Sequence, residues 1–151
     1  MLVALTLALA GCVTAPPTPR PSNSALAEKS GSGEVRHDLE PLTSRFPQLA
    51  SAESATWLSG SLGDDRVPGP GLNWIDAVVT LPASDVAALR SQYALTPATE
   101  TPRVVEALEP ELPTSLLVAA ELDAAFSTDG FQSRVYLGDG SNTLVLVIVF
   151  E

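Results

Sequence analysis

The clearest pattern along this chain is a two-residue alternation of apolar and polar side chains, which is typical of β-strands. It runs through residues 73–81 and again through residues 131–137. Residues 55–62 are rich in strand-forming side chains and end at a turn signal, whereas residues 143–150 are apolar on both faces. The sequence therefore predicts four strands, and the last of them is expected to be central and covered on both sides.

The alternation in residues 73–81 sorts the side chains of this segment onto two faces. Ile75, Ala77, Val79 and Leu81 share the first face, and Trp74, Asp76, Val78 and Thr80 share the second. Because the second set mixes apolar and polar residues, we expect a half-exposed strand of an antiparallel sheet, with its second face toward solvent.

Three further segments carry apolar residues at spacings of three and four, which predicts short helices. These segments are residues 38–46, 84–93 and 116–126. Asp and Ser side chains accept hydrogen bonds from free N–H groups at helix starts, so we expect Asp38 to cap the first helix and Ser84 the second. The pair Asp129-Gly130 is expected to close the third helix.

The stretch between the second and third helices is rich in proline and acidic residues. It covers residues 94–113 and indicates a loop, with one helical turn at residues 104–108. Strands that pair with their sequence neighbours, with helices gathered together, give an α+β domain. We expect an antiparallel sheet of about four strands with two or three helices on one face.

The first twelve residues have a different character from the rest. Leu2 to Leu9 is apolar except for Thr6, and the small residues Ala10 and Gly11 then precede Cys12, the one cysteine of the chain. This order is typical of a secretion signal with a cleavage site. The apolar run is too short for a membrane span, which needs about 20 residues.

The run Leu9-Ala10-Gly11-Cys12 resembles the lipobox of bacterial lipoproteins. The resemblance implies that a diacylglyceryl group is attached to the Cys12 thiol and that the chain is cut just before this residue. Two acyl chains give stable membrane binding where one gives only marginal binding, so the mature protein is expected at the outer face of the cell membrane.

The residues that follow predict a tether and then a domain. Residues 13–34 are dense in Pro, Ser, Thr and Gly, which indicates a flexible linker with a root-mean-square span of about 25 Å. We expect a signal peptide over residues 1–11, a lipidated cysteine and linker over residues 12–34, and one globular domain over residues 35–151.

Composition and charge narrow the classes of function. The chain is 45% hydrophobic, which is ordinary for a globular protein, and its net charge is −10. A surface of this sign repels nucleic acid and anionic head groups, so no nucleic-acid partner is expected. With Cys12 carrying lipid, no thiol remains for a disulfide, a metal site or a nucleophile.

Few residues point to catalysis or to metal binding. The single histidine, His37, lies at the edge of the linker and is expected to face solvent or to cap a helix, since no nucleophile motif accompanies it. The oxygen-rich pair Asp64-Asp65 and the cluster Asp139, Ser141 and Asn142 are read as turns rather than calcium sites. We expect no catalytic residue, cofactor or metal.

Three residues are the candidates for facing a ligand: Trp57, Trp74 and Asp76. An acid within a strand either pairs with an arginine across the sheet or lines a groove, and we favour a structural pair with Arg134. Tryptophan is more often core than site, so core packing is favoured for Trp57 and Trp74 over an exposed platform for a sugar or a partner side chain.

The stretches RHDLEPLTSRFPQL and WIDAVVTLPASDVAALRSQY are similar to small uncharacterised lipoproteins of high-GC Gram-positive bacteria. This resemblance implies a surface location and no assigned activity. We expect a non-catalytic domain that binds an envelope protein or a cell-wall component. The alternative is a carboxylate-dependent hydrolase of cell-wall glycan, and a solute-binding subunit is disfavoured because such proteins need two lobes.

Overall fold

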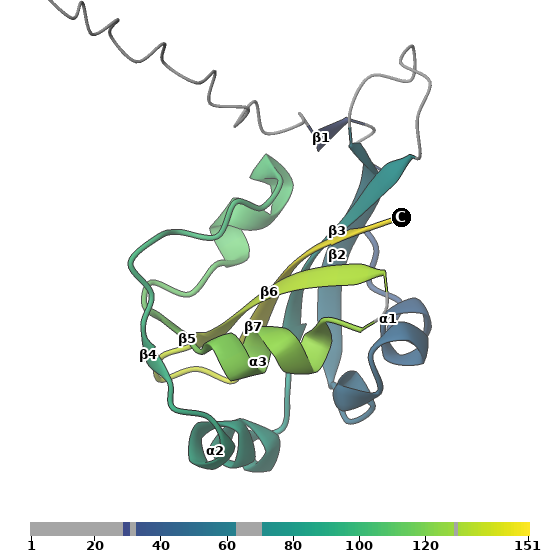
Figure 1. Ribbon diagram of the computed structural model, residues 1–151. Helices are drawn as coiled ribbons and strands as arrows, with labels where there is room; N and C mark the ends of the chain where they lie inside the picture. The colour runs from purple at the N-terminus through teal and green to yellow at the C-terminus, as the bar shows by residue number, and fades with distance from the viewer. Residues whose placement is uncertain (1–28, 31–32, 63–70, 129) are drawn as a thin grey trace, which may run out of the picture.

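The computed structural model describes residues 29–30, 33–62, 71–128 and 130–151 (Figure 1). The lipobox with Cys12, the linker up to residue 28, Asp64-Asp65 and Asp129 lie outside the described residues. Within these ranges, no helix is both long enough and apolar enough to cross a membrane.

The described residues form one antiparallel sheet flanked by short helices, which confirms the α+β class (Figure 1). The order of its seven strands is β1-β2-β3-β7-β6-β5-β4. The strands are β1 (Lys29–Ser30), β2 (Ser54–Leu62), β3 (Leu72–Thr80), β4 (Thr96–Pro97), β5 (Leu116–Val118), β6 (Phe131–Gly138) and β7 (Thr143–Phe150). The four predicted strands are all present and are the long ones, but the predicted count is too low because β1, β4 and β5 extend the sheet at its two ends.

Two hairpins, β2–β3 and β6–β7, meet in the middle of the sheet where β3 pairs with β7. This arrangement puts β7 between two long strands, in agreement with its apolar character on both faces. Three α-helices and two 3-10 helices complete the part of the domain that the structure describes: α1 (Glu40–Arg45), η1 (Pro47–Leu49), α2 (Ala83–Gln92), η2 (Glu106–Glu111) and α3 (Ala120–Phe126).

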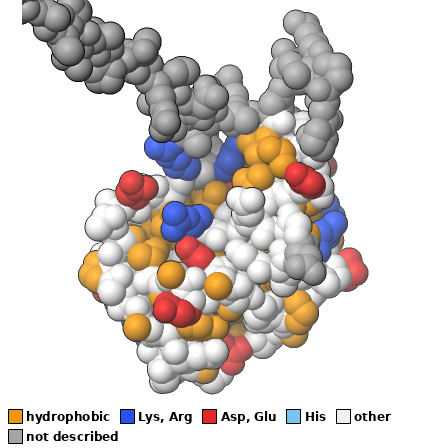
Figure 2. All heavy atoms as spheres, in the orientation of Figure 1, with side chains coloured by type: hydrophobic (Ala, Val, Ile, Leu, Met, Phe, Trp, Pro, Cys, Tyr) orange, Lys and Arg blue, Asp and Glu red, His pale blue; other side chains and the backbone are white. Residues whose placement is uncertain are grey.

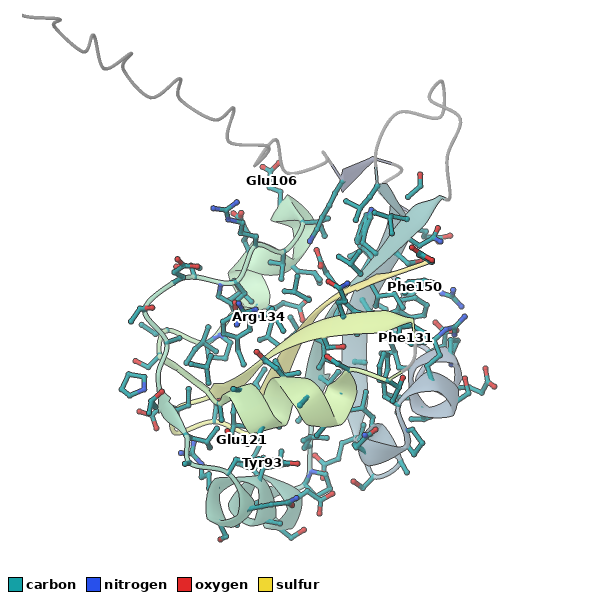
Figure 3. All side chains as sticks on the ribbon, in the orientation of Figure 1. Tyr93, Glu106, Glu121, Phe131, Arg134 and Phe150 are labelled. Carbon is teal, nitrogen blue, oxygen red and sulfur yellow. The ribbon has the colours of Figure 1, made fainter. Side chains whose placement is uncertain are left out.

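The three α-helices and η1 pack on one face of the sheet, as predicted. Their buried side chains, such as Leu42, Val86 and Phe126, join the first face of β3 in one hydrophobic core. Phe131 and Phe150 extend this core at one end and stack on each other at 5.0 Å (Figure 3). Phe131 also lies edge-on to Phe46 of the core at 5.4 Å.

The second face of β3 is also buried, so the prediction of a half-exposed strand is wrong. Trp74 and Val78 pack with Leu58 of β2, Val145 of β7 and Leu108 of η2 in a second, smaller core. The cover on this face is the segment that the sequence indicates as a proline-rich loop. Its one regular turn is η2, which begins two residues later than the predicted turn at residues 104–108.

Tertiary pairing also overrides the prediction of a helix over residues 116–126. Leu116 and Leu117 pair with Gly138 and Leu137 of β6, and the helix begins only at Ala120. The local sequence is compatible with a helix, but the free edge of β6 offers these residues ladder hydrogen bonds, and strand pairing prevails.

The two predicted helix caps are absent. The side chain of Asp38 binds Arg36 instead, and α1 begins after Leu39 without a side-chain cap. The Ser84 hydroxyl donates to Asp85, and α2 begins after Pro82. Asp38 thus lies one residue before the N-cap of α1, and Ser84 lies inside the first turn of α2, so neither side chain occupies a capping position.

Both outer edges of the long strands are occupied. Beyond β5, the backbone N–H groups of Ser133 and Val135 in β6 donate to Ser127 Oγ at 3.0 Å and to Asp123 Oδ1 at 2.7 Å. At the other side, β1 pairs with β2, and Arg36 exchanges two backbone hydrogen bonds of 2.9 Å with Trp57. Satisfied edges oppose unwanted pairing with strands of other chains.

The turn between β6 and β7 is closely packed against the rest of the domain. A methyl group added at Gly138 would collide with Ser141 Oγ and would lie 3.1 Å from Pro113 Cγ. The Ser141 hydroxyl is buried and has no hydrogen-bond partner among the described residues. Gly138 is therefore required here by space, whereas Gly140 is favoured by its backbone φ of 77°.

We expect Gly138→Ala to lower the free energy of unfolding by about 2 kcal/mol, as overpacking does in other cores. Ser141→Ala alone should be neutral or stabilising, because it removes an unpaired buried hydroxyl. The double variant should recover part of the loss in urea unfolding. If Gly138→Ala lowers the free energy of unfolding equally with and without Ser141→Ala, the Ser141 hydroxyl is not the group that the new methyl collides with.

Candidate functional site

Asp76 is the most unusual residue of the described domain, because it is an acid in the middle of β3, an inner strand of the sheet. Its side chain is 0% exposed, and Leu58 and Val147 are its direct neighbours in register on β2 and β7. An isolated carboxylate in such surroundings would cost several kcal/mol. The second face of the sheet can therefore be covered only if Asp76 accepts hydrogen bonds from nearby donors.

Lys29 of β1 supplies the main compensation. Its Nζ donates to Oδ1 and Oδ2 of Asp76, both at 2.6 Å, and to the backbone carbonyl of Arg103 at 2.7 Å. An ammonium group has three protons, so these contacts use its full donor capacity. Nζ also lies 5.3 Å from the centre of the Trp74 ring, within the range of a cation–π contact.

A backbone group completes the surroundings of Asp76. The Val105 N–H donates to Oδ2 at 2.8 Å, so the carboxylate fastens the segment before η2 as well as β1. Three parts of the chain that are far apart in sequence thus meet at one carboxylate. We call the group formed by Lys29, Asp76, Trp74 and Val105 the Asp76 joint.

Burial is the largest influence on the Asp76 carboxyl and raises its pKa above the ordinary value of 3.8. The hydrogen bonds and charge of Lys29 and the N–H of Val105 act in the opposite direction but do not outweigh burial. Because the carboxylate is fully buried and already accepts three hydrogen bonds, the joint is suited to holding segments together rather than to transferring protons to a substrate.

Arg134 is not the partner of Asp76, which corrects the pairing that the sequence favours. The two residues do share one row across β3, β7 and β6, with Val147 between them. Two strand spacings, about 10 Å, separate them. Asp123 of α3 is nearer, and its Oδ2 accepts a hydrogen bond of 3.2 Å from Arg134 Nη1.

Trp57 and Trp74 are both buried, at 3% and 0% exposure, and belong to the two cores on opposite faces of the sheet. Their indole N–H groups donate to backbone carbonyls, Trp57 to Asp38 at 2.9 Å and Trp74 to Ser61 at 3.0 Å. The favoured interpretation of core packing describes both rings, and Trp57 also borders a surface hollow described below.

Among the remaining candidates of the sequence analysis, His37, Asp139 and Asn142 lie at the surface. His37 is exposed, with Nδ1 3.2 Å from the Ala55 carbonyl oxygen. Asp139 and Asn142 belong to the β6–β7 turn, where their backbone groups bond to Ser115 and Leu81. In the part of the chain that the structure describes, no three His, Cys, Asp or Glu side chains gather as metal ligands.

A hollow of about 310 Å³ opens beside β4, and we call it the β4 hollow. It is lined by Ala98, Thr99, Glu100, Val118, Asp123, Arg134 and Tyr136. Two carboxylates therefore line it, but both oxygens of Asp123 are already engaged by Val135 N–H and by Arg134. Burial raises the pKa of the Tyr136 phenol, so this group remains protonated at neutral pH.

A second hollow of about 310 Å³ lies between α1 and β2, and we call it the α1 hollow. It is lined by Arg36, Pro41, Leu42, Arg45, Trp57, Ser59, Ile75 and Phe150. Its floor is apolar and its rim carries two arginines, an unusual combination in a chain with a net charge of −10. Figure 2 shows one face of the molecule, on which acidic side chains are spread widely and basic ones lie in the upper half of the view.

Sequence reasoning singles out Asp76 but misses Lys29, which lies in a stretch with the composition of a linker. The α1 hollow is missed as well, since it joins residues from four separate segments. The one available signal for Lys29 is that an acid on a buried strand needs a cation, and few lysines and arginines are present to provide it.

We expect Lys29→Met to lower the free energy of unfolding by about 3 kcal/mol at neutral pH, because it leaves the Asp76 carboxylate buried without its cation. The double variant Lys29→Met/Asp76→Leu removes both charges and should recover most of this loss in chemical unfolding. Arg134→Met, which removes an exposed arginine from the same face, is the matched control and should change stability by under about 1 kcal/mol. Additive losses in the double variant would contradict the joint.

The raised pKa of Asp76 gives a definite sign to its effect of pH on stability. Between the ordinary and the raised value, the folded state binds more protons than the unfolded state, so wild type loses stability relative to Asp76→Asn as the pH rises through this window and then levels off. The pKa of Asp38 is lowered instead, chiefly by its hydrogen bond from Arg36, so wild type should gain stability relative to Asp38→Asn as the pH rises. Unfolding free energies from pH 3 to 7 test both, and a gain for wild type over Asp76→Asn would show that Lys29 outweighs burial.

Comparisons of this chain with protein-family models, with curated proteins and with solved structures give no match.

Proposed function

We propose that this chain is a lipoprotein anchored through Cys12 at the outer face of the cell membrane, whose domain is a non-catalytic binding module. The signal-like start, the small residues before Cys12 and the linker composition support the anchor. The fold of the described residues supports a compact module that follows the tether.

The observation that carries the proposal is the joint at Lys29. The Asp76 joint and the pairing of β1 with β2 fasten the chain to the sheet at Lys29 and Ser30, inside the stretch of residues 12–34 that the sequence predicts as linker. A module held at a membrane by its N-terminal side needs such an attachment, because any pull along the tether acts first on this strand. A two-residue strand has few ladder hydrogen bonds of its own, and the buried ion pair reinforces it.

The position of β1 also sets which surfaces the proposed anchor leaves accessible. β1 lies at one end of the long strands, and α2 lies at the opposite end (Figure 1). The sixteen residues between Cys12 and Lys29 would span about 20 to 25 Å as a flexible coil. This length allows the domain to turn and to present its sides to a partner or to the cell wall.

Binding is favoured over the alternative of a carboxylate-dependent hydrolase by the state of the acids. Asp76, on which that alternative depends, is enclosed and held by Lys29. In the β4 hollow, Asp123 is occupied by hydrogen bonds that satisfy the edge of β6. The α1 hollow, in contrast, sets apolar side chains beside two arginines and a serine, and no carboxylate lines it.

We expect Cys12→Ser to move the protein from the membrane fraction to the medium when it is expressed in a high-GC Gram-positive host, because the acyl chains would have no attachment point. Thr14→Ser is the matched control and should remain with the membrane. Mass spectrometry of the wild-type N-terminal peptide should find diacylglyceryl on Cys12. Unmodified Cys12, or equal membrane binding of Cys12→Ser, would reject the proposed anchor.

A further inference from the structure

The α1 hollow combines features that belong together in the binding of one class of molecule. Its floor is formed by Leu42, Trp57 and Ile75, which are at most 3% exposed, together with the half-buried Phe150. Its volume of about 310 Å³ is at the lower end of the range for small-molecule sites. The hollow can therefore receive an apolar group about as large as an aromatic side chain.

The two arginines on its rim differ in their state. Arg36 is engaged by Asp38, with hydrogen bonds of 2.6 and 3.1 Å, and its guanidinium lies 4.2 Å from the centre of the Trp57 ring. This pairing neutralises Arg36 and makes it part of a fixed wall. A ligand would meet Arg36 as a flat surface rather than as a free charge.

Arg45 is the cation that remains available. Its Nη1 donates to the Pro41 carbonyl at 2.8 Å, one turn back in α1, and none of the described carboxylates forms an ion pair with it. The bond to Pro41 fixes the guanidinium at the rim of the hollow, and its other N–H groups are left to bind an anion. Guanidinium binds carboxylates by paired, charge-assisted hydrogen bonds.

We propose that the α1 hollow binds a carboxylate carried on a compact apolar body, with the apolar part on the floor and the carboxylate at Arg45. Such a group occurs in a small aryl or alkyl acid and in the last residue of a peptide with a free C-terminus. The inference rests on the binding half of the proposed function and names its ligand class, and it does not depend on the lipid anchor.

The test uses the full chain with Cys12→Ser, so that no lipid is attached, and two pairs of probes. Phenylacetate and acetyl-glycyl-phenylalanine carry the carboxylate, and phenylacetamide and acetyl-glycyl-phenylalanine amide lack it. Titrations followed by the backbone NMR signals of Arg45, Ser59 and Phe150 should give saturable binding of at least one acid. The matching amide should bind about tenfold more weakly, the loss expected for one charge-assisted hydrogen bond.

Two variants separate the roles of charge and space. Arg45→Gln should weaken the acid about tenfold, to the level of its amide, whereas Arg134→Gln, at the exposed arginine of the β4 hollow, should leave binding unchanged. Ser59→Tyr fills the hollow from β2 and should abolish binding of every probe. Thermal unfolding of each variant checks that the domain is folded.

The outcomes distinguish a small acid from a peptide C-terminus as the source of the carboxylate, and they also show whether the proposal fails. Binding of the small acid alone indicates a free metabolite-like acid, and binding of the peptide alone indicates a peptide C-terminus; either supports the ligand class. Equal binding of acid and amide, no effect of Arg45→Gln, or no binding of any probe would overturn it. None of these results bears on the membrane fractionation of the Cys12 variants, so the proposed anchor stands or fails separately.

Discussion

The need to satisfy one carboxylate in the middle of a buried strand shapes much of this domain. Asp76 has apolar neighbours on both sides along the sheet, so its charge is tolerated only with donors close by. Lys29 and the Val105 N–H provide these donors, and each comes from a different part of the chain. β1 and the segment before η2, which covers the second face, are thereby both hydrogen-bonded to the Asp76 carboxylate.

This constraint explains why the two faces of the sheet are built differently. On the first face, α1, α2 and α3 each bury one or two apolar side chains in the larger core, and hydrophobic contact holds them there. The second face is covered by a proline-rich segment that adds the buried Leu108 and the partly buried Val104, Val105 and Leu112 to the smaller core. The hydrogen bond from Val105 to Asp76 adds a directional contact that positions this segment.

The parts of the fold that the sequence predicts are those in which local pattern and tertiary environment agree. β7 is apolar on both sides and is indeed central, and the apolar face of β3 is the one that meets the helices. The pattern fails for the second face of β3, because an acid in a strand predicts a solvent-facing side chain, whereas Asp76 is buried and bound by Lys29. The first residues of the predicted third helix fail for a similar reason, because only the neighbouring edge of β6 makes β5 a strand.

Local sequence pattern also fails to predict most of the candidate site, and the reason is again physical. Lys29 lies in a stretch of linker-like composition and Arg36 follows just after it, yet Lys29 enters the Asp76 joint and Arg36 forms a wall of the α1 hollow. Neither role is visible in local periodicity, since both depend on backbone pairing with β2, at Leu62 for Lys29 and at Trp57 for Arg36. Pairing along one edge thus both closes the sheet and positions the Arg36 guanidinium over the Trp57 ring. The attachment of β1 and one wall of the hollow therefore both depend on the edge of β2, although the two pairings are offset from each other by two residues.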